Sequence, residues 1–197
     1  LTDTFSLKAD LDVAQGGNDY LATWTGTPEA STVIEYALIK TTGVINGAIR
    51  AVPNIQASAP QVVYSPSRNA YGLVYRRVSD GFSLLNFVVA SGTLELTDPI
   101  ELATSQLVQP RTVSWLGGNY FIPTSYCGGG TCIQSWMVVS EAGGVTRTVS
   151  NYDYSVRNAV VGGGRLNVLS GSSVNKFDPA DISTSIVVAL QGDHSVY

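Results

Sequence analysis

Charged residues are scarce in this chain of 197 residues. Asp, Glu, Lys and Arg together make up 13% of it, about half the share that is usual for a globular protein. Aliphatic, aromatic and cysteine residues make up 44%, which argues against intrinsic disorder, because disordered chains combine low hydrophobicity with high charge. Ser, Thr, Asn and Gln must therefore keep the surface soluble. Such a composition is more typical of extracellular β proteins than of intracellular domains.

The chain also lacks clustered positive charge and long apolar runs. Its net charge is −4, and Arg76-Arg77 is its only adjacent basic pair. A nucleic-acid partner is not expected, since binding needs a concentrated positive surface. No apolar stretch reaches the roughly 18 residues of a membrane-spanning helix, so no membrane span is predicted. Residues Leu1 to Phe5 do not resemble a secretory leader, so an exported form would be the mature protein or an excised domain.

Only two cysteines are present, Cys127 and Cys132, on either side of a glycine-rich loop. Their spacing suits opposed positions on a tight hairpin, where a disulfide would imply an oxidising compartment. Reduced, inert thiols are the alternative. A metal site would need two more ligands, and His194 is the only histidine. Calcium loops of the Asp-x-Asp-x-Asp-Gly type are absent, and Asp178 and Asp181 are expected to mark a turn, so no cofactor or metal is predicted.

What the chain does contain is a repeated pattern of short strands. A short apolar strand, a turn of Gly, Asn, Pro or Ser, and a second strand predict a hairpin, and such a hairpin occurs three times, with a weaker fourth copy: Val13–Trp24, Val62–Tyr75, Thr112–Thr124 and Ala159–Leu169. Third strands are predicted at Ile34–Ile39, Leu84–Val89 and Ile133–Val139, and fourth strands at Gly47–Val52, Leu94–Leu102 and Val145–Val149.

The period of this pattern is close to 50 residues. Tyr20, Tyr71 and Tyr120 are separated by 51 and 49 residues, and the glycines that follow the third strands give the same spacing. Four short strands per unit at this period predict a β-propeller blade, in which neighbouring blades cover each other's faces. We therefore expect an all-β fold, a small β-propeller of about four four-stranded blades. The tyrosines, which recur with the fold, are expected to pack between blades.

The blade boundaries are predicted at about 11–56, 57–106, 107–153 and 154–197, the last completed by 1–10, all within one domain over residues 1–197. Thr4–Ala9 looks like an orphan fourth strand, because a first strand follows it at once. The last unit has its third strand predicted at Ser185–Leu190 and lacks a clear fourth. The N-terminal strand could therefore complete the last blade and close the ring, which would remove exposed sheet edges. A fragment of a larger propeller is the alternative.

The hairpin and the strand after it resemble the repeats of large secreted bacterial β-propeller proteins. The likeness rests on Val13–Trp24 with Ile34–Gly43, and on Val113–Tyr120 with Trp115 in the first-strand aromatic position. It covers most of the chain from Asp12 to Val149 and is strong only as a repeat. Departures from the pattern are Gly72, Pro123 and Arg165. The resemblance implies a propeller fold and an exported location, and it implies no single activity.

Catalytic residues are not evident in this framework. Ser-His-Asp catalysis needs a base poised near neutral pH. His194 is the only histidine, and it is expected to be an ordinary tail residue. A glycosidase needs two carboxylates held a few ångströms apart. The starts of the inner strands instead hold Asp10 and Asp12 in one repeat and Arg111 and Arg157 in two others. The chain is therefore predicted not to be an enzyme.

Ligand binding is predicted on the loops between second and third strands, which differ most between repeats: Thr25–Thr32, Arg76–Gly81 and Ser125–Thr131. Loops vary where strands are committed to the core, so Arg76, Arg77 and Tyr126 are the candidate ligand-binding residues. The predicted function is that of an extracellular, non-catalytic binding or adhesion module for a glycan or protein ligand on a cell surface, or a spacer domain. A structural subunit of a self-assembling surface structure and a glycoside-processing propeller enzyme are the alternatives.

Overall fold

The computed structural model describes residues 9–26, 32–53, 55–79, 83–89, 94–102, 109–110, 113–128, 131–151, 156–170, 173–178 and 181–189. These residues form strands and turns without a helix, and therefore without a helix that could cross a membrane. The chain divides into two compact units, Leu1–Pro110 and Arg111–Tyr197, and each is described by itself. A single domain over residues 1–197 stays a prediction.

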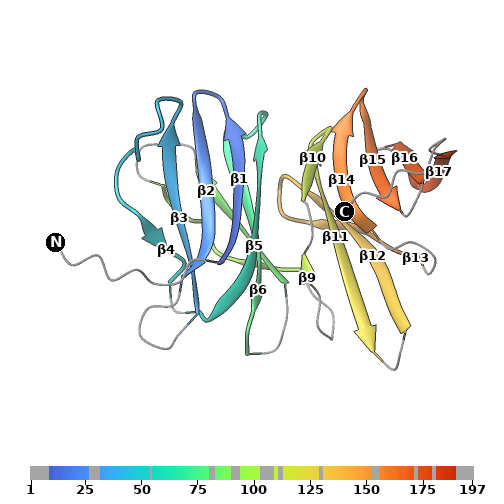
Figure 1. The fold of residues 1–197 in the computed structure, drawn as a ribbon, viewed down its shortest axis with the longest axis horizontal. Helices are drawn as coiled ribbons and strands as arrows, with labels where there is room; N and C mark the ends of the chain where they lie inside the picture. Colours follow the sequence, from blue (N-terminus) through green and yellow to red (C-terminus); the bar gives the residue numbers. More distant parts are fainter. Residues whose placement is uncertain are drawn as a thin grey trace. The chain divides into compact units, whose positions relative to one another are not determined.

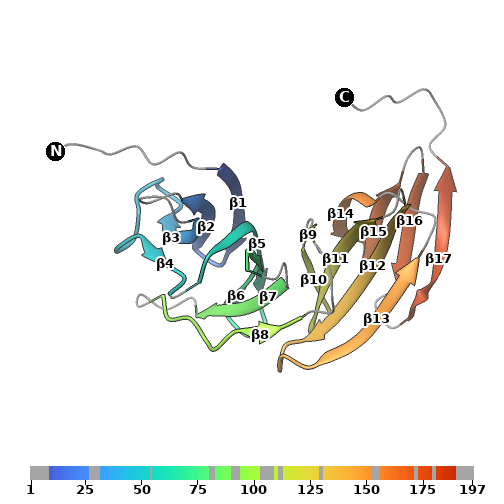
Figure 2. The same cartoon turned by 90° about the horizontal axis from the view of Figure 1, so that it is seen from below.

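In the described part of the first unit, the strands form two antiparallel meanders (Figure 1). Sheet A contains β1 (Ala9–Gly16), β2 (Asp19–Gly26), β3 (Val33–Lys40) and β4 (Arg50–Ala51). Sheet B contains β5 (Ala57–Ser65), β6 (Ala70–Arg77), β7 (Ser83–Val89) and β8 (Ile100–Glu101). Within each sheet, neighbouring strands follow one another in sequence order, and Figure 2 labels the strands of both sheets from β1 to β8. A short strand, β9 (Gln109–Pro110), ends the unit.

The described part of the second unit contains two further meanders. Sheet C includes β10 (Ser114–Leu116), β11 (Asn119–Gly128), β12 (Thr131–Ser140) and β13 (Val145–Asn151). Sheet D includes β14 (Val156–Gly162), β15 (Arg165–Ser170), β16 (Ser173–Asp178) and β17 (Asp181–Ala189). A small apolar cluster joins them through Phe121, Val138, Leu166 and Phe177. The predicted four-stranded unit is thus present in both halves of the chain.

Two turns after a third strand are built alike, which confirms the repeat at the level of single hydrogen bonds. After β3, the Lys40 amide donates to Val44 O at 2.9 Å and the Gly43 amide donates to Lys40 O at 2.8 Å. After β12, Ser140 and Gly143 make the same two bonds at 2.9 and 2.8 Å. Gly43 and Gly143 have φ of 82° and 88°, a left-handed conformation that glycine adopts without a steric penalty.

Sheet D corrects the prediction for the last unit. Its third strand is β16, which was not predicted. The segment predicted as the third strand lies in β17, which is the fourth strand of the sheet. β16 was missed because its two large apolar residues, Val174 and Phe177, do not alternate as those of a half-buried strand do. Sheet D therefore has four strands of its own, which removes the reason for expecting Thr4–Ala9 to complete it. Residues 1–8 lie outside the described part of the chain.

Sheets A and B pack face to face through one apolar core. Its almost fully buried members include Leu21, Ile34 and Leu38 from sheet A and Leu73 and Tyr75 from sheet B, all at most 2% exposed. Burial of a side chain of this size is worth about 1.5–3 kcal/mol. The predicted inter-sheet packing is therefore present within the first unit.

Tyr71 packs between the sheets, as predicted for the repeated tyrosines. It is fully buried, and its hydroxyl donates to Asp19 O of sheet A at 3.1 Å. Its ring lies 5.1 Å from that of Tyr64, at an angle of 54°. Both rings lie against Gly16, at the end of β1, where even a Cβ atom would come within 2.4 Å of Tyr64. A glycine at the end of β1 thus makes room for the aromatic pair of sheet B.

Candidate functional site

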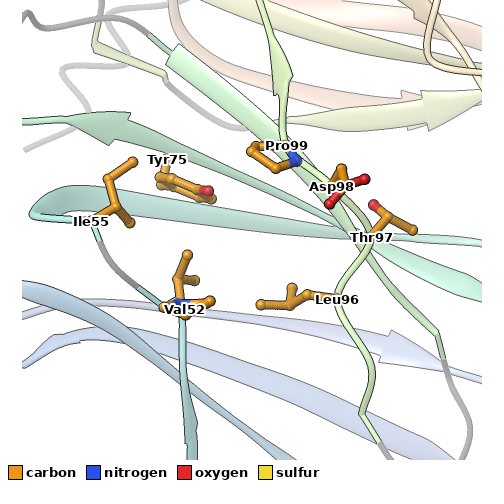
Figure 3. Close-up of a pocket in the computed structure, with 8 residues that line it drawn as sticks. Val52, Ile55, Tyr75, Leu96, Thr97, Asp98 and Pro99 are labelled. Carbon is orange, nitrogen blue, oxygen red and sulfur yellow. The ribbon is translucent and has the colours of Figure 1, made fainter.

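A cavity of about 290 Å³ opens at one end of the packing between sheets A and B (Figure 3). The segment from β4 to β5, called here the crossover (residues 52–53 and 55–56), forms one wall. The segment before β8, called here the linker (residues 94–99), forms another. The lining residues are Val52, Pro53, Ile55, Tyr75, Leu96, Thr97, Asp98 and Pro99.

The crossover is fixed at both ends by backbone hydrogen bonds. The Val52 amide donates to Ile34 O at 2.9 Å, and the Ala57 amide donates to Thr32 O at 3.0 Å. Beside it, the Val78 amide donates to Gln56 O at 2.8 Å. This last bond places the crossover at the end of sheet B where β6 ends. The cavity therefore lies on the side of the sheet from which the predicted ligand-binding loop, Arg76–Gly81, leaves.

The linker corrects the prediction of a continuous fourth strand over Leu94–Leu102. Only Ile100–Glu101 pairs as β8, since Pro99 has no amide hydrogen to donate to a ladder. Leu94 has φ of 49°, which also interrupts an extended strand. The Tyr36 hydroxyl donates to Leu94 O at 3.3 Å and ties the linker to sheet A. The irregular path leaves a hollow in place of a flat edge strand.

The cavity has an apolar floor and a polar rim. Val52 and Tyr75 are buried, and Ile55 and Leu96 are half-buried parts of the same core. Figure 3 shows these four side chains around the hollow, with Thr97 and Asp98 along one side. Asp98 is exposed and is the only acidic residue in the lining. Such a hollow can take up an apolar group and place a cation or an N–H donor beside Asp98.

One predicted arginine lies beside this cavity. Burial raises the pKa of Tyr75 to about 12, and the nearby positive charge of Arg77 partly opposes this shift. Arg77 also forms an ion pair with Glu101 of β8, with 3.2 Å between Nη2 and Oε2. Both side chains are partly exposed, so the pair contributes at most about 1 kcal/mol. Its geometric role is to tie the end of β6 to β8.

The other predicted ligand-binding residues do not line the cavity. Arg76 points to the opposite face of sheet B, because neighbouring residues on a strand alternate. Its Nε is buried without a hydrogen-bond partner among the described residues. Tyr126 belongs to the second unit, where its backbone pairs with Ile133. The Tyr126 side chain lies outside the described part of the structure.

The two cysteines face each other across a hairpin, as predicted. Cys127 pairs with Cys132 in the β11–β12 register, next to the last pair, Gly128 and Thr131. Their side chains lie outside the described part of the structure, so the disulfide stays a prediction.

Asp12 connects the sheets of the first unit. Its Oδ2 accepts a hydrogen bond from the Val62 amide of β5 at 2.7 Å. Burial raises the pKa of Asp12, and hydrogen bonds from the Val62 and Val13 amides act in the opposite direction. The carboxylate is thus engaged in packing one sheet on the next. Among the residues that the structure describes, no three His, Cys, Asp or Glu side chains gather as a metal site would require.

None of the cavity residues was predicted as a site residue. Most of them come from the crossover and the linker, and of these Val52 and Leu96–Pro99 fall within the fourth strands predicted at Gly47–Val52 and Leu94–Leu102. The available signal was Pro53 and Pro99, since proline inside or just after a short strand indicates that pairing stops there. That signal predicts irregular segments, but it does not predict that the two segments enclose a hollow.

No protein-family model and no curated protein sequence matches this chain. Solved structures do resemble it. The subtype N10 neuraminidase-like protein of A/little yellow-shouldered bat/Guatemala/060/2010 has a TM-score of 0.65 at 9% identity, over 93% of this chain and 59% of that one. The N11 neuraminidase-like protein of A/flat-faced bat/Peru/033/2010 has a TM-score of 0.66 at 9% identity, over 95% of this chain and 53% of that one. The third structure is the β-propeller domain of the Trilobed protease from Pyrococcus furiosus, described as having an open velcro topology. It has a TM-score of 0.59 at 13% identity, over 98% of this chain and 60% of that one.

These similarities define the class of protein. With four-stranded antiparallel meanders throughout the described residues, the chain has a β-propeller fold, as predicted. It spans 53% to 60% of the lengths of these three structures. At such low identity the likeness shows the fold alone, because propellers host many unrelated activities.

Proposed function

We propose that this chain is a non-catalytic binding module of an exported protein, and that it binds a macromolecular ligand through the cavity between the crossover and the linker. The observation that carries the proposal is the cavity itself. Binding sites are concave and mostly apolar with a few placed polar groups, and this lining matches that description with Val52, Ile55, Tyr75 and Leu96 below Thr97 and Asp98.

The chemistry of the lining supports binding in preference to catalysis. Acid–base catalysis needs two groups with distinct protonation states near the substrate. Asp98 is the one carboxylate of the lining, and the Tyr75 hydroxyl, with its pKa raised to about 12 by burial, is a poor base or acid near neutral pH. The low charge of the chain and the opposed cysteines support an exported location.

Two arrays would test this function: one of glycans and one of extracellular proteins, both probed with the full chain and with Leu96→Trp. The larger side chain should fill the cavity and abolish binding. Glu95→Trp is the matched control, because Glu95 is an exposed neighbour that does not line the cavity. Melting curves should establish that both variants fold. A ligand whose binding is equally strong for wild type and Leu96→Trp would show that the cavity is not the site.

Self-assembly is a second candidate, favoured by exposed apolar residues on β1. Leu11 and Val13 are 70% and 48% exposed. Val13 pairs with Ala22 as Val62 pairs with Leu73, so Val13 and Val62 are equivalent positions, yet Val62 is only 6% exposed. This face of sheet A could pack on another sheet of the same kind. Size-exclusion chromatography over a range of concentrations decides the matter, since a monomer at every concentration would eliminate self-assembly.

A further inference from the structure

The cavity also indicates what kind of ligand it fits, provided that it is the binding site proposed above. We infer that its partner is a protein segment that inserts one aliphatic side chain next to a lysine or arginine. The cavity volume of about 290 Å³ is at the lower limit of small-molecule pockets, which span about 300–1,000 Å³. It therefore suits a single inserted side chain better than a large ligand, and protein interfaces commonly anchor on such pockets.

The floor distinguishes a protein segment from a sugar. Ile55 and Leu96, both half-buried, offer aliphatic surface. Pro53 and Pro99 have no amide hydrogen to donate to a hydroxyl. Tyr75 is the one aromatic residue of the lining, and it is 1% exposed, so little of its ring is free to stack on a sugar. An aliphatic side chain needs no hydrogen bond and gains from leaving water.

The rim determines the charge of the segment. Asp98 is exposed on the linker, and Glu101 follows three residues later on β8. Arg77 at the end of β6 is held by Glu101 at 3.2 Å. Asp98 has no such partner in the described part of the chain and adds to a net charge of −4. Electrostatic complementarity at an interface rim favours a basic neighbour beside the inserted side chain.

The test selects peptides from a random library displayed on phage, with the full chain as target and Leu96→Trp as the counter-target. We expect the enriched peptides to share an aliphatic residue next to Lys or Arg. Replacing that aliphatic residue with alanine should weaken binding about tenfold or more, since burial of this side chain contributes most of the apolar part of the binding free energy. Enriched peptides that share no aliphatic–basic pair, or no enrichment at all, would overturn the inference.

A charge exchange makes the test specific for Asp98. Asp98→Lys should weaken the selected peptide severalfold and improve the binding of its Lys→Glu version, which is a double-mutant cycle across the interface. Glu95→Lys, an equal charge change on an exposed linker residue outside the lining, should change both affinities little and alike. If Asp98→Lys and Glu95→Lys act equally, the rim does not select charge and the inference fails.

The experiments distinguish failure of this inference from failure of the proposed function. An array glycan that binds wild type and not Leu96→Trp would overturn the peptide inference and leave the binding function standing. If neither the arrays nor the peptide library provides a ligand that Leu96→Trp blocks, both are overturned. Because the full chain is used throughout, neither outcome depends on an isolated unit folding alone.

Discussion

Gly16 offers a direct test of how sheets A and B are held together. In Gly16→Ala the added Cβ would lie 2.4 Å from Tyr64 Cδ2 and 2.6 Å from the Tyr71 hydroxyl oxygen. Overpacking of this kind costs about 1–3 kcal/mol, and displacing the Tyr71 hydroxyl from Asp19 O would add about 1 kcal/mol. Replacing a glycine also stabilises the protein by about 0.4–1 kcal/mol, because alanine reduces the conformational entropy of the unfolded chain. The free energy of unfolding should therefore fall by about 1–3.5 kcal/mol.

Two other glycines serve as controls, each for a different cause. Gly17 has φ of 42° and its nearest contact would be 3.9 Å away, so Gly17→Ala should cost about 1 kcal/mol through the backbone alone. Gly162 ends β14 as Gly16 ends β1, yet its Cβ would meet only Asn167 Nδ2 at 3.5 Å among the described atoms. Gly162→Ala should therefore be nearly neutral.

Urea unfolding followed by circular dichroism measures all three variants. A double-mutant cycle with Tyr64→Ala isolates the contact with that ring. Truncating the ring should relieve the part of the Gly16→Ala cost that comes from Tyr64, leave the part that comes from the Tyr71 hydroxyl, and relieve none of the Gly17→Ala cost. The reasoning is wrong if Gly16→Ala costs no more than Gly162→Ala, or if Tyr64→Ala brings no relief.

Three further predictions concern single groups. Asp12→Ala should lower the free energy of unfolding by about 1–3 kcal/mol, because the Val62 amide loses its acceptor, while Asp12→Asn keeps an acceptor. Burial raises the Asp12 pKa above 3.8, so its stabilising contribution is largest below that pH and declines as pH rises through the folded pKa; Asp12→Asn should lack this decline in urea titrations. Burial raises the Tyr71 pKa to about 12 from 10.0, so stability should be lost as pH rises through about 12; the late absorbance change should be smaller in Tyr71→Phe, where Tyr75 still contributes to it. The disulfide between Cys127 and Cys132 should leave no free thiol in the unreduced protein, and replacing both with serine should cost at most about 2 kcal/mol; a thiol assay and a melting curve check this.

The repeat could be predicted because its landmarks are residues that the backbone itself requires. Gly43 and Gly143 were placed after third strands by spacing alone, and both have the left-handed φ of the same two-bond turn. Tyr71 was predicted to pack between blades because it recurs with the fold, and it does so within the first unit. Features that are dictated by local backbone geometry, or repeated with the fold, are therefore visible in a single sequence.

The missed features lack such a local cause. β16 is a strand because β15 and β17 pair with it on both sides, and its own residues alternate poorly. β8 is short because Pro99 stops the ladder, which predicts an end to pairing but not the path of the residues before it. In both cases the decisive interactions come from other segments of the chain.

The cavity shows why a candidate site is harder to predict than the repeat that supports it. Its walls come from the crossover and the linker, about 40 residues apart in sequence, and each is held by a different contact, Val52 to Ile34 and Leu94 to Tyr36. Neither segment has a motif, because the site needs only that an irregular linker precede a short fourth strand at the open end of a packed core. The strands must satisfy their neighbours in the sheet, whereas Thr97 and Asp98 contribute no strand pairing. The positions that distinguish this propeller from others are therefore expected in the crossover and the linker, whose structure is the part that a sequence repeat predicts least well.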